Sequence, residues 1–277
     1  MSRWLVLTAC ALILGISFNS DAETRTLVFQ RGFDGDETAQ DTFLYAPESV
    51  MNVNFGNFPT IATGRNKWGE RLVALIRFDL SHVPMEARAL DATLCLYDVS
   101  GEFPNQDLIF DVHLVSPENA DWTEGNNDGT RIPVKGTSCW NWLSYDSQHW
   151  AGAPGLSLKG TDYLTSPIGS MLIPKAHGGW VEFHLQKDVV QSWLGKKLNP
   201  GLIISPRVFK EKGQYATFRS SETFEDASTK PKLVLTVEMD DASFLRYRKQ
   251  DAVRSLENAR NDLESKVKKA IGSRDKA

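Results

Sequence analysis

The sequence predicts an all-β protein, a jelly-roll-like antiparallel β-sandwich, followed by a C-terminal amphipathic α-helix. The first observation is strict alternation of apolar and polar residues in short runs, as where Ile76, Phe78 and Leu80 alternate with Arg77 and Asp79. The second is that turn residues separate these runs. The third is that from Ser243 the apolar period lengthens to three or four residues, which indicates a helix.

Residues 1–22 have the pattern of a secretory signal. Arg3 is a short positive start, an apolar stretch follows to Ile16, and Ser20-Asp21-Ala22 offers small residues for cleavage. A lipoprotein signal at Cys10 and an uncleaved anchor are the alternatives. We therefore expect a secreted or cell-surface protein with a sandwich at 23–240 and a basic helical tail at 241–277.

The expected strands follow one another along the whole body of the chain. They lie at residues 26–30, 42–46, 58–62, 71–80, 92–97, 108–115, 180–185, 202–205, 215–219 and 232–238, with one or two helical turns at 186–194. Residues 117–160 form a long irregular connection that contains Trp122, Trp140, Trp142 and Trp150. A connection of this length and aromatic content is typical of an ordered, functional segment.

The tail differs from the body in charge as well as in period. Residues 23–242 contain 20 Lys and Arg against 29 Asp and Glu, whereas residues 243–277 contain 10 against 5. An acidic body with a basic tail is not typical of a nucleic-acid-binding protein. Apolar residues recur from Ala252 to Ala270, so we expect residues 243–271 to self-associate or to bind a partner helix. A solvated, fraying helix is the alternative.

The sequence contains none of the usual catalytic or zinc-binding signatures, and we expect a non-enzymatic protein with no stable membrane span. Without the predicted signal, two cysteines remain, Cys95 and Cys139. In an exported chain they form either one disulfide or two separate buried thiols, and the sequence leaves both open.

Asp34, Asp36, Glu37 and Asp41 form the densest carboxylate cluster, with Gly35 among them. Hard oxygen ligands around a glycine suit Ca²⁺, so we treat these four residues as a possible calcium site. A solvated acidic turn explains the same pattern.

Cations on strands and beside aromatic residues are the candidate ligand contacts. Arg77 and Arg219 could grip uronate carboxylates from an open sheet face; an internal ion pair, for example of Arg77 with Glu222 or Asp79, is the alternative. The loop residues Lys67, Trp68 and Arg71 could form a sugar platform, the alternative being an ordinary solvated loop. Trp142 and Tyr145, in the long connection, could also serve a ligand.

An ordered set of short motifs resembles the DNRLRE-type domain. The set comprises Asp41-Thr-Phe43, Asn54-Phe-Gly56, Arg71 ahead of Leu75-Ile-Arg-Phe-Asp-Leu-Ser81, Ala92-Thr-Leu-Cys-Leu-Tyr97, Asp121-Trp-Thr-Glu-Gly125, Cys139-Trp140, Trp150-Ala-Gly-Ala153, Val189-Val-Gln-Ser-Trp193, Asn199-Pro-Gly-Leu202, Phe218-Arg-Ser-Ser-Glu222 and Pro231-Lys-Leu-Val-Leu235. The resemblance spans residues 26 to 238. It implies a jelly-roll sandwich related to non-catalytic carbohydrate-binding modules, some of which bind acidic polysaccharides such as alginate.

The leading hypothesis is therefore a secreted or cell-surface carbohydrate-binding module for an acidic polysaccharide. A structural matrix or envelope protein that assembles through its C-terminal helix is the alternative. A polysaccharide lyase or hydrolase is the third hypothesis, although nothing in the sequence places two carboxylates across a cleft.

Overall fold

The computed structural model describes residues 22–32, 38–130, 132–196, 199–208 and 211–274. Their strands are β1 Glu23–Gln30, β2 Ala39–Tyr45, β3 Thr60–Arg65, β4 Arg71–Phe78, β5 Arg88–Asp98, β6 Leu108–Leu114, β7 Trp142–Ser144, β8 Gln148–His149, β9 Gly169–Ile173, β10 Gly179–His184, β11 Leu202–Pro206, β12 Gln214–Arg219 and β13 Lys232–Met239. The α-helices are α1 Lys187–Gln191 and α2 Asp241–Arg274, with single 3₁₀ turns at Pro117–Asn119 and Ala227–Thr229.

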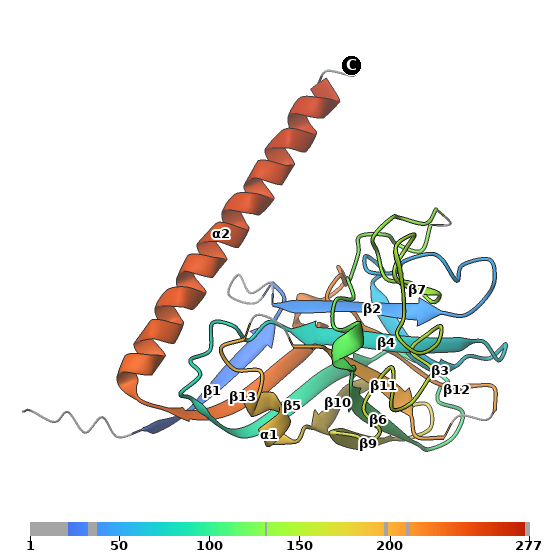
Figure 1. The fold of residues 1–277 in the computed structure, drawn as a ribbon, viewed down its shortest axis with the longest axis horizontal. Helices are drawn as coiled ribbons and strands as arrows, with labels where there is room; N and C mark the ends of the chain where they lie inside the picture. The colour runs from blue at the N-terminus through green and yellow to red at the C-terminus, as the bar shows by residue number, and fades with distance from the viewer. Residues whose placement is uncertain (1–21, 33–37, 131, 197–198, 209–210, 275–277) are drawn as a thin grey trace, which may run out of the picture.

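The strands form two antiparallel layers that face each other, as the alternation predicts (Figure 1). One layer runs β1-β13-β5-β10 and the other β2-β4-β11-β6-β9. Strand β12 pairs with β3 and meets β5 at Phe218–Asp98, and β3 pairs with the start of β4, so the layers are joined along one side. The predicted all-β sandwich with a C-terminal helix is confirmed.

The main core lies between the layers. Its fully buried side chains include Phe29, Leu94 and Phe183 from the first layer and Ile76 and Phe110 from the second. These are the apolar positions of the alternating runs, so hydrophobic burial fixes which face of each strand points inward.

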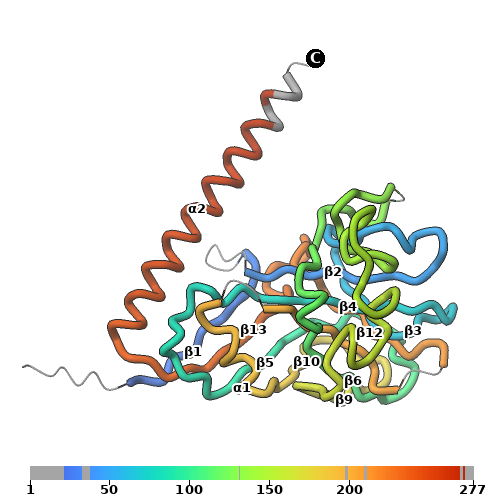
Figure 2. The backbone as a smooth tube through the Cα atoms, in the orientation of Figure 1, coloured from blue at the N-terminus to red at the C-terminus, as the bar shows by residue number. Residues whose placement is uncertain are grey.

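A second apolar cluster covers the outer face of β4. Val73 and Leu75 point away from the main core and pack against Trp122, Trp140 and other residues of the long connection. Figure 2 shows this connection passing over β2 and β4. Strand β4 is therefore buried on both faces, which explains its nearly continuous apolar sequence.

Helix α2 has 34 residues and leaves the sandwich beside β1 and β13 (Figure 1). Its first turns are anchored through Tyr247, which is 6% exposed and stacks on His82 with ring centroids 5.4 Å apart. Arg254 Nη2 lies 2.7 Å from Asp79 Oδ2, and its Nη1 donates to His82 Nδ1 at 2.8 Å. The helix is thus fixed at its base, while the apolar residues farther along it are exposed.

Candidate functional site

Arg77 does not contribute to an open ligand face, contrary to the prediction. Its Nη1 and Nη2 donate to the carbonyl oxygens of Ala120 and Trp122 at 3.0 and 2.9 Å, and its Nε donates to Gln40 Oε1 at 2.8 Å. The guanidinium also lies 4.5 Å from the centroid of the Trp122 ring. In the described part of the chain Glu222 pairs with Arg31 and Asp79 with Arg254, so neither is the ion-pair partner of Arg77 that the alternative named. Arg77 anchors the start of the long connection to β4, because two of its donors bind backbone carbonyl oxygens of this segment while the third binds Gln40 on β2.

Arg219 lies at the end of β12, whereas Arg77 lies near the end of β4. Arg219 forms an ion pair with Glu225, and its side chain is 19% exposed. A guanidinium that is already paired and largely covered offers few free hydrogen-bond donors to the carboxylate of a ligand. The prediction that Arg219 grips uronate carboxylates is therefore not supported by its surroundings.

The calcium prediction is only partly open to inspection. Asp34, Asp36 and Glu37 lie outside the described residues. Asp41 is 1% exposed, and its Oδ2 accepts a hydrogen bond from Ser221 N at 2.7 Å. Among the residues that the structure describes, no group of three metal-ligating side chains is found.

Asp41 instead belongs to a buried charged cluster. Its backbone N–H donates to Glu124 Oε1 at 2.9 Å, and Arg31 Nη1 lies 3.2 Å from Glu124 Oε2 and also pairs with Glu222. Burial raises the pKa of Glu124 to about 8, the charge of Asp41 adds to this effect, and Arg31 opposes it. Burial likewise raises the pKa of Asp41 to about 6. This cluster joins β2, the long connection and the segment after β12.

Several motif residues hold the connection in place rather than facing a ligand. Asn54 is fully buried, and its Nδ2 donates to the carbonyl oxygens of Glu124 and Ser138 at 2.7 and 2.9 Å. Gly125 has φ 75°, and a Cβ there would come within 2.3 Å of Asn54 Oδ1, so this turn requires glycine. The motif residues Asn54 and Gly125 thus fix the long connection to the sandwich.

The predicted loop residues lie on the turn between β3 and β4 and at the start of β4. We define the basic loop surface as Arg65, Lys67, Trp68 and Arg71. Arg65 and Arg71 are direct cross-strand partners in the β3–β4 register, and Trp68 is 64% exposed with Lys67 Nζ 4.7 Å from its ring centroid. Burial and the neighbouring Arg65 lower the pKa of the Arg71 guanidinium. Two like charges placed opposite each other are unfavourable, and an anion bound beside them would relieve that repulsion.

The turn that carries Trp68 is held by Asn66. Asn66 Oδ1 accepts from Trp68 N and Glu70 N at 3.0 and 2.9 Å, and its Nδ2 donates to Glu70 Oε2 at 2.8 Å. Gly69, with φ 92°, closes the turn and packs beside the exposed Lys212. The exposed indole is therefore presented on a preorganised turn, which lowers the entropic cost of binding.

Trp142 and Tyr145 lie on and beside the β7–β8 hairpin. Trp142 stacks on His149 with ring centroids 3.8 Å apart, and Tyr145 meets Trp142 edge-on at 6.0 Å. The nearby Trp140 faces the Arg71 guanidinium at 5.6 Å, which connects the hairpin to the basic loop surface. The rings of Trp142 and Tyr145 are half-buried; they contact each other, and Trp142 also contacts His149.

The sequence reasoning missed a second aromatic group. Trp180 on β10 and Tyr97 on β5 are cross-strand partners with ring centroids 5.4 Å apart, and Lys232 Nζ lies 4.2 Å from the Trp180 ring centroid. We call these three residues the sheet-face platform. Their positions alternate with core residues such as Leu96 and Val181, so the strand pattern already indicated that they face outward.

Of the two alternatives that the sequence left open for the cysteines, the structure has the separate thiols: Cys95 and Cys139 are both free and buried. Cys95 alternates with the core residues Leu94 and Leu96 and thus faces away from the interior on β5. Cys139 precedes Trp140 in the cluster outside β4. The main core separates the two thiols, and burial raises the pKa of each to about 11, so neither is a reactive nucleophile.

Within the described residues, no helix is long and apolar enough to cross a membrane. A scan against protein-family models finds no match, and a search of curated proteins finds no similar sequence. The resemblance to DNRLRE-type domains thus stays a prediction based on the motifs in the sequence.

Proposed function

We propose that this protein is a secreted or cell-surface binding module that holds an acidic polysaccharide through the basic loop surface. The observation that carries the proposal is the exposed Trp68 ring on a fixed turn beside Lys67 and the opposed Arg65–Arg71 pair. The sandwich fold and the resemblance to carbohydrate-binding modules support the same conclusion.

A uronate sugar has two features that this surface matches. Its C–H face is apolar and stacks on an indole ring, while its carboxylate accepts charge-assisted hydrogen bonds from guanidinium or ammonium groups. The segment from Arg65 to Arg71 contains three cations and one carboxylate, Glu70, which Tyr45 and Asn66 already engage. The surface therefore favours an anionic over a neutral polymer.

The experiment is affinity electrophoresis and calorimetry with alginate, polygalacturonate and a neutral β-glucan. We expect retardation by an acidic polymer that weakens as salt rises, because the exposed charges are screened. Trp68→Ala and Lys67→Ala should each weaken binding by roughly ten-fold, consistent with the loss of one stacking or charged contact.

Trp180→Ala is the matched control, since it removes an indole with a lysine above its ring from the sheet-face platform. Loss of binding in Trp180→Ala but not in Trp68→Ala would move the proposed site to the sheet face. Binding of no glycan by the folded protein would overturn the proposed function.

We propose that binding occurs without cleavage. Incubation with the same polymers should produce no new reducing ends and no ultraviolet absorbance from unsaturated uronates. Appearance of either product would support the lyase or hydrolase hypothesis instead.

A further inference from the structure

The distal part of α2 exposes an apolar stripe. Val253, Leu256, Leu263 and Val267 are 48%, 72%, 63% and 48% exposed, and we call these four residues the seam. Most of the stability of helices in proteins comes from packing of an apolar face against other residues. The exposed residues of this stripe remain in contact with water unless a partner covers them, and such apolar surface marks an interaction site.

The seam follows a heptad repeat. Val253 and Val267 occupy a positions, Leu256 and Leu263 occupy d positions, and Arg260 occupies the a position between them. β-branched residues at a combined with leucine at d favour parallel, two-stranded coiled coils. Arg260 Nε lies 2.9 Å from Glu264 Oε1, so its charge is partly balanced, and a polar a residue of this kind fixes the register.

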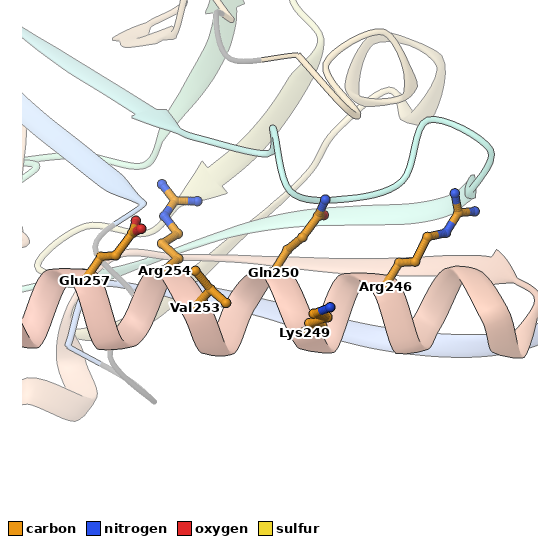
Figure 3. Close-up of a pocket in the computed structure, with 6 residues that line it drawn as sticks. All are labelled: Arg246, Lys249, Gln250, Val253, Arg254 and Glu257. Carbon is orange, nitrogen blue, oxygen red and sulfur yellow. The ribbon is translucent and has the colours of Figure 1, made fainter.

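The sandwich lies against a different side of the helix. Figure 3 shows Arg246, Gln250 and Arg254 extending from the same side of the helix. Arg254 pairs with Asp79, and Arg246 pairs with Glu86. Farther along, Asn258, Asn261 and Asp262 line a groove together with Arg31, Ser221, Glu222 and Lys230. The seam is thus open to a partner without displacing α2 from its own sandwich.

From these observations we infer that the seam pairs with the seam of a second copy of this chain as a short parallel coiled coil. The pairing is self-complementary because the same a and d residues meet across the two-fold axis. With the exposures above, each copy would bury roughly 500 Å², near the lower limit for a specific interface, so the dimer dissociates readily on dilution. The seam lacks aromatic residues and is flanked by charges of both signs, which disfavours a membrane surface as its occupant.

Sedimentation of the purified protein over about 1 to 200 µM tests the pairing. We expect the mass to rise from that of one chain toward twice that value. The double variant Leu256→Glu/Leu263→Glu should stay monomeric at every concentration. Leu172→Glu, a leucine 50% exposed on β9, is the matched control and should dimerise as the native chain does.

A second measurement fixes the orientation. In a parallel pair Leu256→Cys cross-links to itself on mild oxidation, because equivalent d residues face each other. Cross-linking only when Leu256→Cys is mixed with Val267→Cys would overturn the parallel arrangement, because a d residue meets an a residue in an antiparallel pair. A monomer at the highest concentration, or a dimer that survives the double substitution, would overturn the pairing itself.

Discussion

At the residue scale, the polar groups that attract attention in the sequence divide into anchors and exposed contacts. Arg77, Asn54 and Asp41 are engaged with backbone groups of segments distant in the chain. Lys67 and Trp68 contact each other and are exposed to solvent. Burial separates the two groups, since a buried polar side chain must satisfy its hydrogen bonds internally and an exposed one need not.

The anchoring role of Arg77 predicts a large loss of stability on its removal. Arg77→Ala leaves two carbonyl oxygens of the long connection without a donor, and we expect a cost of about 3 kcal/mol in urea unfolding. Arg88→Ala is the control, because Arg88 is 63% exposed and forms only an ion pair with Glu238. Its loss should cost under about 1 kcal/mol. Equal costs for the two variants would contradict the anchoring role.

The raised pKa of Glu124 predicts a stability that falls as pH rises. The folded protein holds a proton on Glu124 up to pH about 8, whereas the unfolded chain releases it near the ordinary value of 4.5. Between pH 4.5 and about 8 the folded state therefore binds more protons than the unfolded chain. The free energy of unfolding that this proton contributes is lost as pH rises through 8. Thermal unfolding of Glu124→Gln between pH 6.5 and 9 should show a smaller decline than the native protein.

Glu48→Gln, at an exposed position, is the control for this series and should follow the native pH profile. Most of the titration of Asp41, whose pKa is raised to about 6, and of His82, whose pKa is lowered from 6.5 to about 4, lies below this window, and both groups are present in the native chain and in Glu124→Gln alike. Identical profiles for Glu124→Gln and the native chain would show that Glu124 does not govern the slope.

At the element scale, β4 and α2 carry the two main consequences of the fold. Strand β4 is covered on both faces. Arg71 at its start faces the Trp140 ring, whereas Arg77 near its end donates to the backbone of the long connection. Helix α2 is fixed at its base, where His82 contacts Tyr247 and Arg254. The two ends of each element therefore have different roles.

The base of α2 should loosen in acid. Burial lowers the pKa of His82 to about 4, and the neighbouring Arg254 acts in the same direction. Asp79 and Asp251 also face this ring, and Asp79 favours its protonation. The released imidazole titrates near 6.5, so the docked state loses on the order of 3 kcal/mol as pH falls from 6.5 to 4.

Amide exchange over residues 241–258, corrected for intrinsic rates, measures this loosening. We expect protection to fall between pH 6.5 and 4.5 in the native protein. His82→Gln retains an acceptor for Arg254 without a titrating ring, and its protection should vary much less with pH. A native profile that is flat over this range would contradict the role of His82.

At the scale of the whole molecule, the two proposals reinforce each other. A parallel α2 pair would place the two sandwiches on opposite sides of the helices and present two basic loop surfaces to one polymer. Two linked sites bind a long chain more tightly than either site alone, typically by a hundred-fold or more.

This arrangement predicts a difference between polymer and oligomer. The double variant Leu256→Glu/Leu263→Glu should bind a short uronate oligosaccharide as the native protein does, but should lose roughly ten-fold or more of its affinity for the polymer. Surface-immobilised alginate and a tetrasaccharide in solution provide the two measurements. Equal loss for both ligands would show that the substitutions damage the site rather than the pairing.

The sequence by itself determined most of the strands, their inward faces and the C-terminal helix, because alternation and the helical period follow directly from backbone geometry. It also placed Lys67 and Trp68 together, since they are neighbours in the chain. It did not predict the short strands β7, β8 and β9 or the side of the helix that packs on the sandwich. Only the tertiary structure decided that Arg77 is enclosed by the long connection, that Tyr97 and Trp180 face each other, and that the thiols are separated by the core. These outcomes depend on contacts between residues far apart in sequence, and local patterns contain no information about which distant segment covers a given face.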